Sequence, residues 1–238
     1  DSEALKKITP PFHRLTYTEA ADILKGPQTR DFLSSQLQQL EKLKEEIEER
    51  ITQLEDGQQQ KNIKKWKKDK MAAEAIELNS NLSEISARIE NNPKHAKLAS
   101  EFEWGKDLGG SDETIISMMH DKPVFVTHYP GDAKAFYMKL DRSNDKVVEN
   151  FDLLAPDGFG EIIGGSAREE DYDILLERTR RQGLDPENYR WYLDLRKYGT
   201  VPHGGFGLGI ERTVAWITGE KHIRQCIAFP RMMDKIYI

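Results

Sequence analysis

The stretch that decides the fold lies near the C-terminus and reads Gly204-Gly205-Phe206-Gly207-Leu208-Gly209-Ile210-Glu211-Arg212. Four glycines in six positions predict a strand that a ligand can approach closely, because no Cβ atom stands in the way. The arginine falls in the first turn of a following helix, where its planar guanidinium suits a phosphate group. The pattern predicts a nucleotide site, although glycine runs also build bulges and tight packing.

The region around this stretch alternates strands and helices. Short apolar runs predict the strands, and the short links between them predict antiparallel pairing. We expect strands over residues 123–128, 135–140, 147–154 and 161–166, and helices over 172–182, 186–197 and 210–217, the last capped by Gly219. The prediction is an α+β fold in which helices back an antiparallel sheet.

Two amphipathic helices are expected in the middle of the chain. Apolar residues recur at steps of three and four over 31–54 and again from Met71 to Ile89. Asp56-Gly57 indicates a turn between these helices, and Asn91-Asn92-Pro93 indicates the end of the second. We predict an inserted antiparallel helical hairpin over 31–92, between a leader with the first helix (1–30) and a C-terminal domain (93–238). In the leader, Thr16 and Glu19 have the spacing of a capping box.

A local basic cluster surrounds Trp66 near the expected turn. Such a cluster can contact a phosphate backbone. Alternatively, it is a solvated helix face balanced by glutamates of the partner helix. The lysines are Lys61, Lys64, Lys65, Lys67, Lys68 and Lys70, and the glutamates are Glu41, Glu45, Glu46, Glu48 and Glu49.

Composition narrows the class of protein. The 238 residues carry a formal net charge of −6, so any contact with nucleic acid must come from a local patch. The sequence contains no apolar run of the roughly 20 residues that a membrane helix needs, and no signal-peptide pattern. The single cysteine, Cys226, excludes an internal disulfide and fits a reducing compartment. We predict a cytoplasmic protein that makes no membrane contact.

Three charged residues upstream of the glycine stretch are candidate site residues. Asp152 and Glu161 lie on expected strands among apolar residues and glycine. Mg²⁺ between these carboxylates and a phosphate would remove their mutual repulsion, whereas the alternative is an ion pair with an arginine. Arg168 is either a substrate clamp or the surface partner of an acid in the range 169–171.

These motifs resemble the class II aminoacyl-tRNA synthetases. The segment 196–212 resembles the third signature motif of that class, and Gly160-Glu161-Ile162-Ile163-Gly164-Gly165-Ser166-Ala167-Arg168 resembles its aspartyl/asparaginyl branch. Ala135-Phe136-Tyr137-Met138-Lys139 and Phe229-Pro230-Arg231 favour the asparaginyl-tRNA synthetases. The resemblance is loose over residues 11–24 and close from about residue 103 onward.

The resemblance implies a role for each matching residue. Arg212 would bind the γ-phosphate of ATP, and Gly207 and Gly209 would leave room for the adenine and ribose. Asp152 and Glu161 would bind ATP and Mg²⁺. Arg168 would bind the side chain of asparagine. The pocket-lining residues would be Tyr137 and His203.

The implied reaction joins asparagine to tRNA(Asn) through an asparaginyl-adenylate, in an enzyme that is a homodimer when intact. The first and second motifs of the class have no counterpart, and residues 31–92 lie outside the family pattern. We therefore expect a C-terminal fragment that is inactive alone.

Three other readings stay open at this point. They are an aspartyl-tRNA synthetase, an asparagine synthetase that forms an aspartyl-adenylate, and a non-catalytic module that binds RNA or protein.

Overall fold

The computed structural model describes residues 5, 6, 8–59, 63–231 and 233. The chain divides into two compact units, one formed by Asp1–Leu24 together with Phe102–Ile238 and the other by Lys25–Glu101. The first unit is built on a β-sheet and the second on a pair of long helices. None of the described helices is long and apolar enough to cross a membrane.

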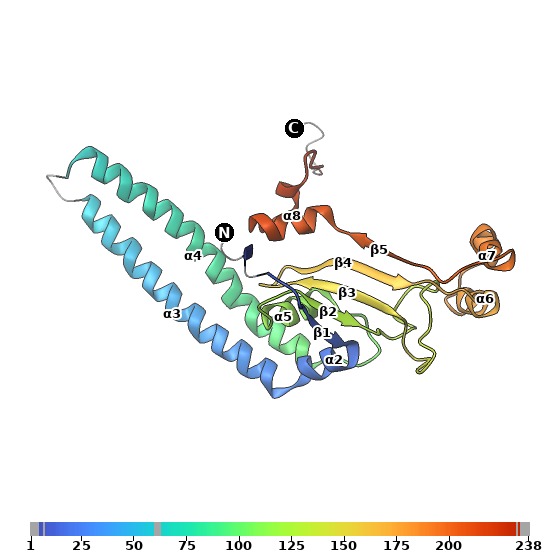
Figure 1. Ribbon diagram of the computed structural model, residues 1–238. Helices are drawn as coiled ribbons and strands as arrows, with labels where there is room; N and C mark the ends of the chain where they lie inside the picture. The colour runs from blue at the N-terminus through green and yellow to red at the C-terminus, as the bar shows by residue number, and fades with distance from the viewer. Residues whose placement is uncertain (1–4, 7, 60–62, 232, 234–238) are drawn as a thin grey trace. The chain divides into compact units, whose positions relative to one another are not determined.

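The first unit contains a five-stranded sheet with the strand order β1-β2-β3-β4-β5 (Figure 1). β1 runs parallel to β2, and the later neighbours are antiparallel. The predicted α+β class with a mostly antiparallel sheet is therefore confirmed. The strands are β1 His13–Thr16, β2 Val124–Thr127, β3 Asn150–Ala155, β4 Gly160–Ala167 and β5 Gly204–Leu208.

Helices of this unit lie on both sides of the sheet, with α8 on one side and α2 and α5 on the other (Figure 1). Trp216 of α8 packs against a cluster formed by Leu153, Ala155 and Ile162. The predicted capping box starts α2, since Thr16 and Glu19 exchange bonds between side chain and backbone N–H at 2.7 and 3.2 Å. The helices are α2 Tyr17–Lys25, α5 Gly110–Met118, α6 Tyr172–Arg181, α7 Arg190–Lys197 and α8 Ile210–Thr218, with 3₁₀ turns η1 Pro186–Tyr189 and η2 Ile223–Cys226.

The second unit is an antiparallel pair formed by α3 Pro27–Gln58 and α4 Lys65–Ser100. Buried Leu40, Ile47 and Ile51 of α3 pack against Ile85 of α4. Arg50 and Glu74 form an ion pair across the helices at 2.7 Å. The predicted pair of amphipathic helices is therefore present.

The two predictions of where the helices of this hairpin end were wrong. Asp56-Gly57 is not a turn but lies within α3; a Cβ atom at Gly57 would stand 2.2 Å from Cε of Met71, so this glycine permits close helix packing. Asn91-Asn92-Pro93 does not end α4, which continues to Ser100. The buried amide of Asn92 donates to the carbonyl of Leu33 at 3.0 Å, and tertiary contacts of this kind override the local signal.

The expected strand over 135–140 is also absent. This segment forms turns with isolated bridges from Met138 to Arg168 and from Leu140 to Val148. Arg178 of α6 donates to the carbonyls of Ala135 and Met138 and to that of the preceding Gly131, so its side chain supplies partners that a neighbouring strand would otherwise provide. The sequence reading also missed β1, because four residues in a proline-containing leader carry little pattern, and α5, which begins beside two glycines.

Candidate functional site

Two neighbouring strands present glycine on one face of the sheet. Gly164 of β4 pairs with Gly207 of β5, and Ser166 pairs with Gly205. Side chains alternate between faces along a strand, so these residues share a face, which we call the front face. We call Gly164, Gly205 and Gly207 the glycine floor. A Cβ atom at Gly207 would meet nothing within 4 Å, so the floor is open above β5.

Two carboxylates meet at one end of the glycine floor. Asp152 of β3 pairs with Gly164 and therefore lies on the front face. A Cβ atom at Gly164 would stand 2.6 Å from Oε1 of Glu161 and 3.2 Å from Oδ1 of Asp152. The absence of a side chain at Gly164 is what lets both carboxylates converge above it.

Each carboxylate already has a cationic partner. Nη1 of Arg212, in the first turn of α8, donates to the carbonyl of Glu161 at 2.7 Å and to its Oε2 at 3.2 Å. Nζ of Lys134 lies 3.0 Å from Oδ2 of Asp152 and 2.9 Å from Oδ1 of Asp107. The ion pair with an arginine that the sequence left as an alternative is therefore present for Glu161, whereas Asp152 pairs with a lysine.

The two carboxylates also suit a hard cation. Mg²⁺ prefers oxygen ligands and is commonly held by one or two carboxylates, with phosphate and water completing its shell. Within the described ranges, no group of three or more His, Cys, Asp or Glu side chains forms a metal site. The two carboxylates of Asp152 and Glu161 fit Mg²⁺ that takes its remaining ligands from phosphate and water.

Arg168 lies at the other end of the floor. Its guanidinium donates to the carbonyl and hydroxyl of Ser166 and to the carbonyl of Gly205, and it stacks 4.9 Å from the ring centre of Tyr137. Ser166 is two residues beyond Gly164, so the guanidinium stands roughly 7 Å along the strand from the carboxylates.

The acids that follow Arg168 are engaged elsewhere. Glu170 pairs with Lys139 at 2.8 Å, Asp171 caps α6, and a carboxylate oxygen of Glu169 accepts from the backbone of Leu140. The alternative of a surface pair for Arg168 is therefore wrong within the described part of the chain. Its guanidinium faces the open glycine floor instead.

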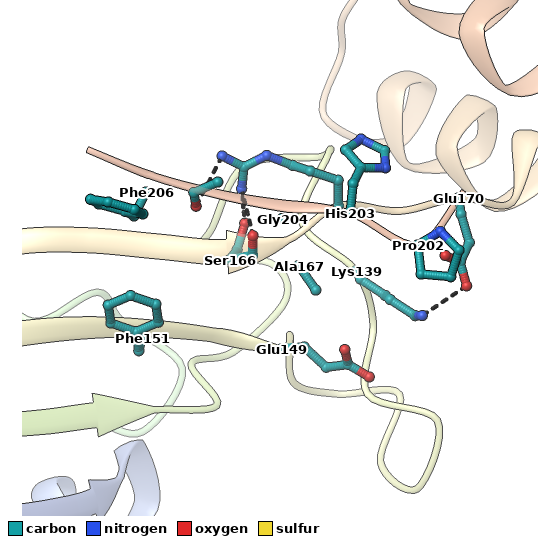
Figure 2. Close-up of a pocket in the computed structure, with 12 residues that line it drawn as sticks. Lys139, Glu149, Phe151, Ser166, Ala167, Glu170, Pro202, His203, Gly204 and Phe206 are labelled. Atoms are coloured by element: carbon teal, nitrogen blue, oxygen red, sulfur yellow. Dashed lines mark hydrogen bonds and ion pairs between the residues drawn. The ribbon is translucent and has the colours of Figure 1, made fainter. Parts of the chain in front are cut away.

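Strand alternation puts Phe151 and Phe206 on the opposite, back face, where their side chains flank Gly165. They line a cavity of about 490 Å³ together with His203 and with Arg168, Ser166 and Gly205, so the cavity includes the Arg168 end of the glycine floor (Figure 2). Asp152, Glu161 and Arg212 do not line it. His203 lines this cavity beside Arg168, and a ring nitrogen of its imidazole lies 2.8 Å from the carbonyl oxygen of Val201.

Two residues near the carboxylates were missed by sequence reasoning. Lys134 is half-enclosed; burial would lower the pKa of this amine, but Asp152 and Asp107 outweigh burial and raise it. Glu113 of α5 has its pKa raised to about 7, first by burial and then by the negative charges of Glu161 and Asp152. Neither belongs to a periodic or glycine-rich pattern, so only the fold brings them to the site.

The hydroxyl of Tyr129 is a further unusual group beside Asp152. Its side chain is fully buried, and the oxygen has no hydrogen-bond partner within the described chain. Burial raises the pKa of Tyr129, and the charge of Asp152 raises it further. The phenol therefore stays protonated and can act as a donor to Asp152 or to a molecule bound next to it.

Two curated proteins are similar to this chain. Asparagine--tRNA ligase of Herpetosiphon aurantiacus is 52% identical over 145 residues, covering 61% of this chain and 32% of the relative. Asparagine--tRNA ligase of Sorangium cellulosum is 53% identical over 136 residues, covering 57% of this chain and 30% of the relative. This chain therefore spans about a third of the length of the curated relatives it matches.

A solved structure is also similar to this chain. Asparaginyl-tRNA synthetase from Pyrococcus horikoshii, complexed with asparaginyl-adenylate, matches with a TM-score of 0.65 and 37% identity, covering 100% of this chain and 38% of that one. The profile of the family "tRNA synthetases class II (D, K and N)" matches residues 1–233. With the glycine floor and the charged groups at both of its ends, this match shows that the chain belongs to the class II tRNA synthetases of the D, K and N family.

Proposed function

We propose that the chain supplies the ATP and amino-acid site of an enzyme that joins asparagine to tRNA(Asn). The observation that carries this proposal is the single glycine floor, with Asp152, Glu161 and Arg212 at one end and Arg168 at the other. A triphosphate and a small polar amino acid can be held side by side on such a surface. The relatives named asparagine--tRNA ligase support asparagine as that amino acid.

The reaction needs no protein nucleophile. An oxygen of the α-carboxylate of asparagine attacks the α-phosphorus of ATP, and the bond to pyrophosphate breaks. A ribose hydroxyl of the tRNA then attacks the acyl carbon of the adenylate, the acyl–phosphate bond breaks, and AMP leaves as the hydroxyl loses its proton. Mg²⁺ held by Asp152 and Glu161 would supply neutralisation of phosphate charge. Arg212 binds the γ-phosphate and Arg168 the carboxamide oxygen, so catalysis is positioning and charge stabilisation.

The glycines and the aromatic residue have supporting roles in this proposal. Gly207 and Gly209 leave room for the adenine and ribose, and the open space above Gly207 supports this role. Tyr137 holds the guanidinium of Arg168 by stacking. His203 keeps only a proposed place at the edge of the amino-acid pocket, through its carbonyl, which accepts from the backbone N–H of Arg168 at 2.9 Å.

Replacing Arg212 tests the ATP site directly. We expect Arg212→Ala in the intact enzyme to reduce asparagine-dependent pyrophosphate exchange roughly a hundredfold or more, because a donor to the developing charge is lost. Arg181→Ala is the control, since this exposed arginine pairs only with the exposed Asp132 in the described structure. An unchanged exchange rate in the Arg212 variant would refute the assignment.

Amino-acid specificity separates this proposal from its nearest rival. Arg168 can bind the carboxylate of aspartate as readily as a carboxamide. Pyrophosphate exchange measured with asparagine and with aspartate distinguishes the two, and we expect exchange with asparagine only. Exchange with aspartate, followed by release of asparagine when ammonia is added, would instead identify an asparagine synthetase.

We also propose that the intact enzyme is a homodimer and that this chain alone does not aminoacylate. The chain spans only about a third of the length of these relatives, which supports an activity that needs the intact enzyme. Formation of asparaginyl-tRNA by the isolated 238-residue chain would overturn the second statement. Sedimentation of the intact enzyme as a monomer would overturn the first.

The lysines at the start of α4 are proposed to contact the tRNA backbone. Residues 64–70 are all exposed, and Trp66 is 65% exposed. The described lysines are Lys64, Lys65, Lys67, Lys68 and Lys70, none of which makes an ion pair within the described chain; Lys61 lies outside the described residues.

The register of the two helices argues against the alternative that glutamates of α3 balance these lysines. Because Arg50 pairs with Glu74 in an antiparallel hairpin, the glutamates over 41–49 lie opposite residues that follow Glu74. They do not lie opposite the lysines, which precede it. The cluster is therefore not balanced by those glutamates, and it offers positive charge with an exposed indole for stacking on a base.

A matched pair of variants of the intact enzyme tests the contact. In the first, Lys65, Lys67, Lys68 and Lys70 become Gln; in the control, Lys42, Lys44, Lys94 and Lys97, which pair within their own helices, become Gln. We expect only the first to raise the KM for tRNA and to flatten its salt dependence, with pyrophosphate exchange unchanged in both. Equal effects of the two variants would contradict a specific contact.

A further inference from the structure

The strand that carries Glu161 contains an irregularity. Leu153 pairs with Ile163 but Leu154 pairs with Glu161, so β4 has one extra residue at this point. In a regular strand, Glu161 and Gly164 are three residues apart and would face opposite sides of the sheet. The bulge changes this alternation, and Oε1 of Glu161 lies above Gly164 on the front face.

A carboxylate from another element holds this bulge. Oε2 of Glu113, in the first turn of α5, accepts a hydrogen bond from the backbone N–H of Glu161 at 3.2 Å. The preceding Gly160 has φ +70°, and a Cβ atom there would stand 3.1 Å from the same oxygen of Glu113. The backbone before Glu161 is therefore shaped so that the carboxylate of α5 can reach it.

We infer that Glu113 is a positioning residue, which fixes the direction of Glu161 by binding the backbone at the bulge. The inference rests on the proposed function for its consequence, since it is Glu161 that would share the metal ion of ATP. Glu113 touches neither Arg212 nor Asp152 through a hydrogen bond in the described structure, so its effect passes through Glu161. Groups that orient a metal-binding side chain change affinity by about 10- to 100-fold when removed.

Two substitutions separate positioning from direct binding. Glu113→Ala removes the acceptor, whereas Glu113→Gln keeps an oxygen acceptor and removes the charge. We expect Glu113→Ala to raise the KM for ATP about tenfold and to leave the KM for asparagine unchanged. Glu113→Gln should restore the ATP value. If Gln is as damaging as Ala, the charge itself is required and the positioning role is wrong.

Amide hydrogen exchange gives a readout that does not depend on catalysis. In the folded chain, we expect the Glu161 amide to lose protection in Glu113→Ala and to retain it in Glu113→Gln, with Glu220→Ala, an exposed change, as control. Unchanged protection in Glu113→Ala overturns the inference even if the enzyme is active. Absence of pyrophosphate exchange in the wild type would refute the proposed function, yet it would leave this measurement of the hydrogen bond intact.

Discussion

At the scale of single residues, two glycines of the floor differ in what surrounds them. A methyl group at Gly164 would collide with the carboxylate of Glu161 at 2.6 Å, whereas one at Gly207 would meet no protein atom. Gly164 is therefore needed by the protein's own side chains. Gly207 is not needed by the fold, so its open space is available to a ligand.

The substitution Gly207→Ala tests this difference. We expect it to leave the thermal stability of the chain unchanged, because the new methyl group meets nothing within 4 Å, and to raise the KM for ATP of the intact enzyme. Gly110→Ala is the matched control, since it also has open space but lies in α5. A normal KM for ATP in Gly207→Ala would show that the adenine and ribose do not lie above this residue.

The raised pKa of Glu113 predicts how stability depends on pH. The pKa is about 7 in the folded chain against an ordinary 4.5, so the folded state holds a proton that the unfolded state has lost. The contribution of Glu113 is fully present below pH 4.5 and is lost as the pH rises through 7. Because this group is partly exposed, the change amounts to about 1 to 3 kcal/mol.

Comparing the wild type with Glu113→Gln measures the pH-dependent contribution of Glu113 to the free energy of unfolding. We expect the free energy of unfolding of the wild type to fall relative to the variant between pH 5 and pH 8, since the amide does not titrate. Denaturant unfolding at a series of pH values provides the data. A constant difference across that interval would mean that Glu113 titrates normally in the folded chain.

The sequence could predict only part of the site at this scale. Glycine spacing predicted the strand β5, which leads to Arg212 in the following helix, because a run of glycines is visible in the local sequence. Glu113 and Lys134 left none, since each reaches the site through a turn or helix from elsewhere in the chain. The family resemblance rested on matching sequence motifs, and neither Glu113 nor Lys134 lies in one of those motifs.

At the scale of helices and strands, too, some features could be predicted from the local sequence and others depend on distant residues. Strands with apolar alternation, such as β2, and helices with end signals, such as α8 with Gly219 at φ +78°, could be predicted from local sequence. The segment 135–140 is apolar enough for a strand, but the side chain of Arg178 takes its carbonyls. Local propensity fails where a distant residue provides the backbone partners.

Pro93 gives a prediction at this scale. It lies in the interior of α4, where it cannot donate a hydrogen bond and its ring crowds the preceding turn, and its side chain is exposed. We expect Pro93→Ala to raise the stability of the hairpin by about 1 to 3 kcal/mol. Ala87→Pro, at another exposed position of the helix, should lower it. Thermal unfolding followed by circular dichroism tests both, and a lower melting temperature for Pro93→Ala would contradict the argument.

At the scale of the whole molecule, the sheet unit and the helical hairpin can be assigned separate tasks. The sheet unit contains the glycine floor and its charged ends, and the hairpin contains a basic cluster that does not lie opposite the glutamates over 41–49. The family match extends over residues 1–233, but the part of the chain that matches the curated relatives covers only about a third of their length. We therefore assign the proposed activity to the intact enzyme, in which we propose that this chain provides the amino-acid and ATP site.

The central claim is that the front face holds both substrates at once. A crystal structure of the intact enzyme with asparagine and a non-hydrolysable ATP analogue tests it most directly. We predict the γ-phosphate at Arg212, the metal ion between Asp152 and Glu161, and the carboxamide against Arg168. Density for the nucleotide in the cavity beside Phe151 and Phe206, away from Asp152, Glu161 and Arg212, would contradict the account.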